Sequence, residues 1–285
     1  MIDYLNIPLG GAGPDRAADF DPDGGAGLAG WEEAARKIRA SPLMNARLLG
    51  CEPLAHPRLA EVIGLLRVNG FQRLRVQTGG WPLKDPERRE QFFRMGVRLF
   101  EVRFLSSRKG EHDRLAGRRG TFAAAWAAVQ EVKKAGEERR GGGQTFLEAR
   151  LVVTPQNPAT LERTLSEISR WPVQQLAVVP GRQPFPLGPA GEAIRRGIEH
   201  ALTNKKWVYL EGWPACLFPK LELHLRELTR RVEGEKTFSH ECDGCAYRRF
   251  CAGVPGWFRP GQEPLAPPLP GGRDWEKFHA RIILG

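Results

Sequence analysis

The sequence predicts an α/β fold, a partial (β/α)6 TIM-like barrel followed by an irregular C-terminal extension. Two observations support this prediction. Strand-like and helix-like segments alternate from residue 45 to about residue 210, which is typical of a parallel sheet with helices packed outside it. The alternation then stops, and the remaining chain is rich in cysteine, proline and glycine. Because parallel crossovers are right-handed, a sheet of about six units either curls into an incomplete barrel or winds in both directions.

Each predicted element follows from its apolar spacing, and glycine-rich turns separate the elements. Residues three and four apart predict helices over 31–39, 59–66, 86–95, 122–136, 161–170 and 190–202. Short apolar runs predict strands over 47–49, 74–78, 97–105, 146–153, 175–179 and 207–210. A further strand is expected at 4–7, before a long Gly- and Pro-rich connection. We therefore divide the chain into a flexible N-terminal segment (1–30), the partial barrel (31–210) and a C-terminal region (211–285).

Composition and charge limit the class of protein. Hydrophobic residues make up 41% of the 285 residues and charged residues 27%, a balance typical of globular proteins. The chain has no run of about 18 uncharged apolar residues and no secretory signal at its start, so we expect a cytoplasmic protein without a membrane span. The net charge of +10 favours anionic partners, but the basic residues are scattered and form no nucleic-acid-binding signature. We expect a solvated basic surface and no dedicated nucleic-acid module.

Four of the five cysteines form a candidate metal site. An odd number of cysteines is poor material for a disulfide framework. Cys242 and Cys245 share one tight turn, Cys251 follows six positions later, and Cys216 lies upstream. Four thiolates would fully ligate one [4Fe-4S] cluster and leave no open iron. Tetrahedral zinc bound by four cysteines needs the same ligands, and spacing alone does not separate the two metals. Cys51 stands apart, as a small buried side chain or as a reactive thiol.

Several segments resemble the radical SAM superfamily. Residues 50–57, Gly-Cys-Glu-Pro-Leu-Ala-His-Pro, resemble its Gly-Gly-Glu-Pro segment, and residues 76–80, 111–117 and 151–157 resemble later segments in the same order. This resemblance implies that Gly50, Glu52 and Pro53 lie at the end of the second barrel strand, where that family binds the amino group of S-adenosylmethionine (SAM). The Cys-x2-Cys-x5-Cys spacing is similar to the auxiliary-cluster spacing of the family's SPASM and twitch extensions, which favours iron over zinc.

One departure from the family decides the expected function. The family holds its catalytic cluster with Cys-x3-Cys-x2-Cys in the loop after the first strand, and residues 11–23 contain no cysteine. The resemblance therefore implies no radical chemistry, and it leaves SAM binding open. The expected function is that of an electron-transfer or substrate-presenting partner of an active modifying enzyme, with an acidic peptide as a fitting partner of a +10 chain.

Two other functions stay open. The first is an enzyme that keeps a SAM-like pocket and performs non-radical chemistry, for which Glu52 and Cys51 are the available groups. The second is an adaptor that holds zinc through four cysteines and binds an anionic partner. No catalytic residue is assigned. Glu52 could hydrogen-bond an amine ligand or cap backbone donors, and these two interpretations are weighted equally.

The remaining conspicuous residues are expected to be structural. The resemblance makes residues 111–117, which include His112, a linker. Trp126 and Trp207 are expected in the core. His224 and His240 are expected near the cysteines without binding the metal.

Overall fold

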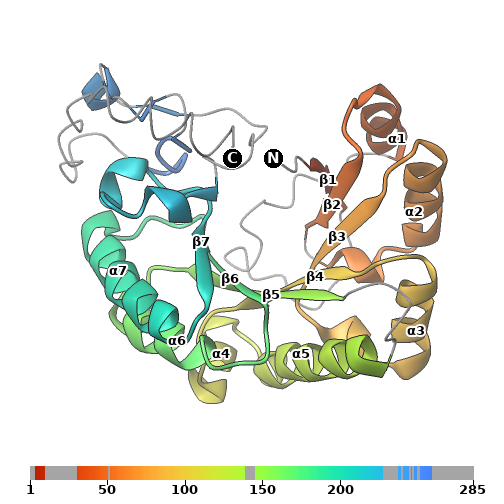
Figure 1. Cartoon of the computed structure of the whole chain (residues 1–285), viewed down its shortest axis with the longest axis horizontal. Coiled ribbons are helices and arrows are strands. Elements are labelled where there is room, and N and C mark those ends of the chain that lie inside the picture. Colours follow the sequence, from red (N-terminus) through yellow and green to blue (C-terminus); the bar gives the residue numbers. More distant parts are fainter. Residues whose placement is uncertain are drawn as a thin grey trace.

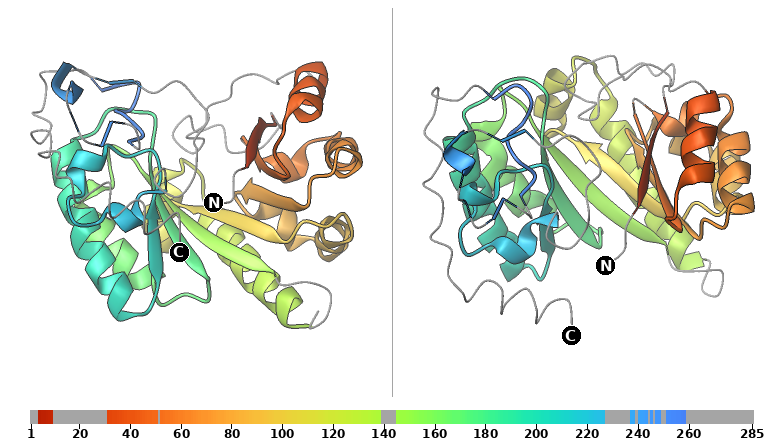
Figure 2. Two further views of the ribbon diagram at one scale, coloured as in Figure 1. Left: turned by 45° about the horizontal axis from the view of Figure 1, so that its top comes forward. Right: turned by 90° about the horizontal axis from the view of Figure 1, so that it is seen from above.

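The computed structural model describes residues 4–9, 31–50, 52–138, 145–226, 237–238, 240–243, 245, 247–248 and 251–258. Cys51 and the loop at 11–23 lie outside the described residues. Within them, seven parallel strands form one curved sheet in the order of the chain, with β1 and β7 at its two ends (Figures 1 and 2). The strands are β1 (Leu5–Pro8), β2 (Asn45–Leu49), β3 (Arg73–Thr78), β4 (Leu99–Phe104), β5 (Phe146–Val153), β6 (Gln175–Pro180) and β7 (Trp207–Leu210).

The helices lie outside the curved sheet, as Figure 1 shows. They are α1 (Trp31–Ala40), α2 (Leu59–Val68), α3 (Pro86–Arg94), α4 (Lys109–Leu115), α5 (Thr121–Glu138), α6 (Leu161–Ile168) and α7 (Leu187–Thr203). Six strand–helix units are followed by a seventh strand, so the predicted partial barrel is confirmed. The strands around Leu49 and Val76 are parallel neighbours, with Ala46 opposite Leu74 and Leu48 opposite Val76.

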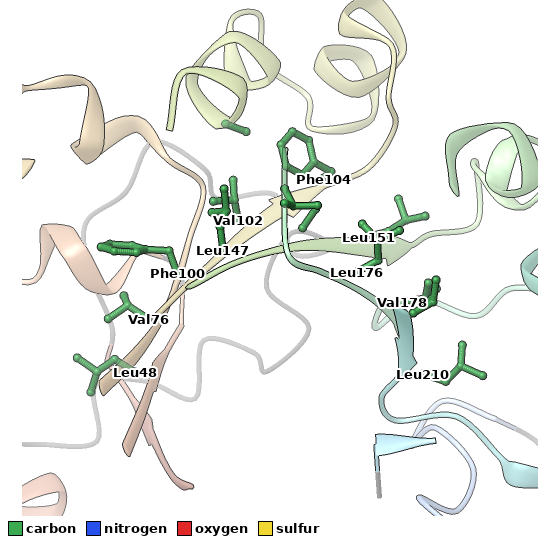
Figure 3. Close-up of a cluster of buried hydrophobic side chains, with 14 of the residues drawn as sticks. Leu48, Val76, Phe100, Val102, Phe104, Leu147, Leu151, Leu176, Val178 and Leu210 are labelled. Carbon is green, nitrogen blue, oxygen red and sulfur yellow. The ribbon is translucent and has the colours of Figure 1, made fainter. Parts of the chain in front are cut away.

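The convex face of the sheet carries the hydrophobic core. Side chains alternate across a strand, so every second residue faces the helices. Figure 3 shows the outward-facing residues Leu48, Val76, Phe100, Val102, Phe104, Leu147, Leu151, Leu176, Val178 and Leu210. Each of these is buried, and together with the helix faces they form one cluster. The residues between them on each strand point to the concave side, which is therefore a separate inner face.

Residues 111–117 lie in the connection between β4 and α5, as expected of a linker, and most of them belong to the helix α4. Asp113 of α4 accepts hydrogen bonds from the backbone nitrogens of Gly120 and Phe122, both at 2.8 Å, and from Thr121 Oγ1 at 2.9 Å. These are donors at the start of α5 that the helix itself leaves without partners. The buried His112 accepts from the Leu105 backbone nitrogen at 3.2 Å. The segment is therefore a capping device for α5.

The helix α5 continues to Glu138, beyond the predicted stop at Gly136. A Cβ at Gly136 would lie 3.1 Å from the Thr145 Cβ, so this glycine permits a close approach between α5 and the segment leading into β5. It does not end the helix.

The segment after β7 packs against the barrel. Trp213 is fully buried, and its indole nitrogen donates to the Val178 carbonyl at 2.9 Å. Trp257 donates in the same way to the Gly181 carbonyl at 2.9 Å. Both tryptophans lie against Phe185, with ring centroids 5.9 and 4.9 Å away. The barrel and the C-terminal region thus share one hydrophobic core, and the predicted boundary at residue 210 stays a prediction.

Trp126 packs against the core, as expected, but Trp207 does not. Trp207 is 37% exposed and stacks on His224, with ring centroids 4.5 Å apart. Trp207 lies two positions before Tyr209 on β7, so both side chains point to the inner face of the sheet. Because Trp207 is the first residue of the strand, it lies at the rim of that face. Among the described residues, no helix has the length and apolarity to cross a bilayer.

Candidate functional site

Glu52 links the ends of β2 and β3 at the mouth of the barrel. Its carboxylate accepts from Thr78 Oγ1 at 2.8 and 2.9 Å, from the Gly79 backbone nitrogen at 2.8 Å and from the Leu54 backbone nitrogen at 3.4 Å. The side chain is fully buried. Burial raises the pKa of Glu52 to about 7, against the opposing effects of the Arg103 charge and of the three donors. Of the two interpretations weighed from the sequence, these contacts are those of a cap.

The other two predicted mouth residues lie beside Glu52. Gly50 has a φ of 127°, and a Cβ there would collide with the carbonyl oxygen of Leu9 on the neighbouring strand segment, so only glycine fits. Arg103 Nη1 donates to the Gly50 carbonyl at 3.1 Å. Pro53 opens a short 3-10 helix, Pro53–Ala55. The structure therefore brings Gly50, Glu52 and Pro53 together, while their role in SAM binding stays a prediction.

Gln77 is a buried polar group that the sequence analysis did not single out. It precedes Thr78 on β3, is fully buried, and neither of its amide atoms has a hydrogen-bond partner within the described structure. Buried amides nearly always have partners, so such a group is a typical contact for a polar ligand.

The inner face of the barrel carries a buried network of ions that sequence reasoning missed. It consists of Arg47, Arg75, Arg150 and Arg226 with Glu101, Glu148 and Glu211. Glu211 accepts from Arg47 Nη1 at 2.7 Å and from Arg150 Nη2 at 2.8 Å, which joins β2 and β5 to the residue after β7. Arg226 reaches Glu211 at 3.1 Å and lies 4.5 Å from the centroid of the Tyr209 ring.

The arginines keep these carboxyl groups ionised. Burial alone would raise the pKa of Glu101 and of Glu211, but the facing guanidinium groups hold both pKa values well below the ordinary range. A signal for this network was present in the sequence. Strands of a buried parallel sheet are usually continuous apolar runs. In β4 and β5, charged residues instead occupy alternate positions, at Glu101, Arg103, Glu148 and Arg150.

The four predicted metal ligands line one small pocket. Cys216 comes from the short helix Ala215–Leu217, Cys242 ends the short helix His240–Cys242, and Cys245 and Cys251 follow. All four are free of disulfides. The antiparallel bridge between Thr237 and Val254 holds the two sides of this segment together.

Backbone donors and mutual repulsion shape the chemistry of the pocket. Cys251 Sγ accepts from the backbone nitrogens of Ala215 at 3.2 Å and Gly253 at 3.3 Å, which favours a thiolate there. Burial, and then the charges of Cys251, Cys245 and Cys242, raise the pKa of Cys216 to about 12. A thiol with such a pKa loses its proton at neutral pH when a bound cation replaces that proton. The chemistry of these donors therefore suits a thiolate-bound cluster, in which each cysteine binds a different iron atom.

One charged side chain lines the cysteine pocket, whereas the two nearby histidines do not. Arg248 lines the pocket, pairs with Asp243 at 2.6 Å and lies 5.2 Å from the centroid of the Phe238 ring. His224 hydrogen-bonds the Val208 carbonyl at 2.7 Å and does not line the pocket, and neither does His240. Across the described residues, no three His, Cys, Asp or Glu side chains are grouped closely enough to hold a single metal ion.

Solved structures share the fold of this chain, a partial β/α barrel of parallel strands. The structure of SuiB from Streptococcus suis matches with a TM-score of 0.54 and 11% identity, over 82% of this chain and 53% of SuiB. SuiB bound to S-adenosylmethionine matches with a TM-score of 0.53 and 11% identity, over 76% of this chain and 50% of that one.

A third structure, SuiB bound to the precursor peptide SuiA, matches with a TM-score of 0.51 and 11% identity, over 67% and 44% of the two chains. The chain spans about half the length of these structures. No family model and no curated protein sequence matches it. At 11% identity the likeness establishes the fold.

Proposed function

We propose that this protein is an iron–sulfur protein built on a radical SAM barrel, in which Cys216, Cys242, Cys245 and Cys251 hold one [4Fe-4S] cluster. Its role is to pass electrons to a peptide-modifying enzyme or to present that enzyme's substrate. One observation carries the proposal: four cysteines that form no disulfide, from segments up to 35 positions apart in the sequence, lie on the wall of a single pocket.

The chain's own residues would tune such a cluster. A cluster with four thiolate ligands supplies single electrons and has no open iron. The amides of Ala215 and Gly253 would withdraw charge from the Cys251 sulfur, and the Arg248 guanidinium on the wall would offset negative charge. A reducing cytoplasm, which the sequence predicts, would keep the thiols available to iron.

The absence of a second cysteine group supports a role without radical chemistry. All five cysteines of the chain are accounted for, and none lies in residues 11–23. Reductive cleavage of SAM needs a cluster bound by only three thiolates, because its fourth iron is then open to SAM. We therefore expect no 5′-deoxyadenosine from this chain. A peptide partner is supported by the likeness to a structure that holds a precursor peptide and by the net charge of +10.

The test is metal analysis of protein purified without oxygen. The wild type should contain about four iron and four sulfide per chain and absorb broadly near 400 nm, on the order expected for thiolate-bound iron. Cys245→Ser should lose this absorption, and Cys51→Ser, outside the ligand set, should keep it. Stoichiometric zinc without iron would contradict the proposal and support the adaptor alternative.

The unpartnered amide of Gln77 favours a second candidate function. In this candidate, the barrel mouth keeps a pocket for a polar ligand, and non-radical chemistry on SAM takes place there. Gln77 and Glu52 lie on adjacent strand ends, and the amide has a free donor and a free acceptor in the described structure. Equilibrium dialysis with labelled SAM, comparing the wild type with Gln77→Leu, tests this candidate. Binding that the substitution abolishes would support the pocket, and no binding to the wild type would exclude SAM as its ligand.

A further inference from the structure

A basic hollow lies on the outer surface where α4 meets the start of α5. It has a volume of about 660 Å³, and four of the residues that line it are the cations Lys109, Arg114, Arg118 and Arg119. The side chains of all four are exposed. The hollow is far in sequence from the cysteine pocket and shares no lining residue with it.

Within the described part of the chain these four cations form no close ion pair, unlike their neighbours, although the charge of Arg114 helps to lower the pKa of Glu111. Arg108 pairs with Glu167 at 3.5 Å, and Arg163 pairs with Glu111 at 2.6 Å, immediately beside the hollow. Within the described residues no carboxylate lies within ion-pair distance of any of the four. Like charges held close together repel one another, which raises the free energy of the folded chain. An anion bound among them would reduce this repulsion.

Asp113 is the one carboxylate on the hollow's wall within the described part of the chain, and it is turned inward. Both of its oxygens accept hydrogen bonds from Gly120, Thr121 and Phe122 at the start of α5. Four cations therefore face one carboxylate that is already engaged. The first donors of α5 are engaged as well, so an anion in the hollow would be bound by side chains and not by the helix terminus.

The composition of the hollow favours a peptide over a nucleic acid. Among the described residues no aromatic side chain lines it, so it offers no platform on which bases could stack. Three glycines, Gly110, Gly117 and Gly120, keep its walls low, which lets a main chain approach. Arginine pairs with carboxylate through two parallel hydrogen bonds, and three of the four cations are arginines.

We propose that the basic hollow between α4 and α5 is the docking surface for an acidic peptide segment of a partner or substrate. In an extended segment, alternate carboxylates follow one another about 7 Å apart on one side, so two or three of them can meet the cations together. This inference rests on the proposed function for its peptide partner and gives that partner a place on the chain. It does not depend on the cluster, and the two proposals can fail separately.

The experiment measures binding of fluorescein-labelled octaglutamate by fluorescence anisotropy at low salt, about 50 mM. Three proteins are compared: the wild type, the triple variant Arg114→Gln, Arg118→Gln, Arg119→Gln, and the matched triple variant Arg73→Gln, Arg88→Gln, Arg170→Gln. The matched arginines are also exposed and unpaired within the described residues, and both variants lose three charges. Metal content and visible spectra of all three are recorded, so that loss of the cluster is seen independently.

The hollow variant should bind octaglutamate about tenfold more weakly, the size expected for three exposed ion pairs, and the matched variant should change less than about twofold. Labelled octaglutamine should not bind. Equal weakening in both variants would show an effect of overall charge and overturn the proposal, as would no binding to the wild type. If octathymidylate binds as tightly through the same three arginines, the surface serves a nucleic acid and the peptide assignment is wrong.

Discussion

Replacing Glu52 with Gln should change how stability depends on pH. Glu52 is fully buried at the barrel mouth, and its pKa is about 7 in the folded protein against an ordinary value of 4.5. Between these two values the folded state holds a proton that the unfolded state has released. The free energy of unfolding therefore falls as the pH rises through this window, and this contribution to stability is fully present below pH 4.5.

The magnitude follows from the two pKa values. Their difference is about 2.5, and each pH unit corresponds to about 1.4 kcal/mol, so Glu52 makes the folded state about 3 kcal/mol less stable above pH 7 than below pH 4.5. Gln keeps an acceptor for Gly79 and cannot ionise. The stability of Glu52→Gln relative to the wild type should therefore rise by about 3 kcal/mol across the window.

The comparison between the two proteins is needed because His112 acts in the opposite direction. Burial lowers the pKa of His112 to about 4, so the unfolded state binds its proton first and stability falls as the pH drops below 6.5. This effect is common to both proteins and cancels in the difference. Glu101 and Glu211 do not interfere, because their arginine partners keep them ionised throughout the window.

The assay is urea unfolding without oxygen, followed by tryptophan fluorescence at several pH values between about 4.5 and 8 and at constant ionic strength. Glu61→Gln on α2 is the matched control, since Glu61 is exposed and Arg58 holds its pKa below the ordinary value. Its difference from the wild type should not vary with pH above about 5. A flat difference for Glu52→Gln as well would refute the reasoning that burial keeps this carboxyl protonated.

Three further outcomes are expected. Arg226→Met leaves buried carboxylates of the inner network with one partner fewer and should cost about 3–5 kcal/mol in urea unfolding, whereas less than about 1 kcal/mol would show that the network is not cooperative. Asp113→Ala removes the cap of α5 and should cost about 1–2 kcal/mol, with faster amide exchange confined to the first turn of that helix; unchanged exchange would contradict the capping role. Gly253→Ala places a Cβ against a facing backbone oxygen at a φ of 80° and should reduce iron content and visible absorption, whereas Gly256→Ala, with open space around it, should change neither.

The outer layer of the barrel could be predicted from the sequence because each strand carries apolar residues that pack against helices. Val76 and Leu151 are examples, and both lie in strands whose predicted ranges match the structure closely. The inner layer could not be derived in the same way. Whether Glu101 is a solvated side chain or a buried partner of Arg47 depends on how far the sheet curls, which no local pattern reports.

The candidate sites were predictable to different degrees. Local spacing placed Cys242 and Cys245 together, but the contribution of Cys216 depends on how the segment after β7 folds back. Glu52 was placed at the mouth, and its capping role depends on Thr78 from another strand. The basic hollow was hidden for a similar reason: the arginines at its centre do not stand out in a chain with 43 basic residues until the paired ones are set aside.

The ion network also determines how this chain can be divided. Glu211 and Arg226 lie after the last strand, yet both complete the charge balance of the barrel's interior with Arg47, Arg150 and Glu148. A barrel cut after residue 210 would keep Glu148 without one of its arginines and would leave Arg47 and Arg150 without one of their carboxylates. Uncompensated charges of this kind are costly in an interior. The two halves of the protein are therefore not interchangeable modules, and a graft of the cysteine-bearing segment onto another barrel would need to carry the matching interior charges with it.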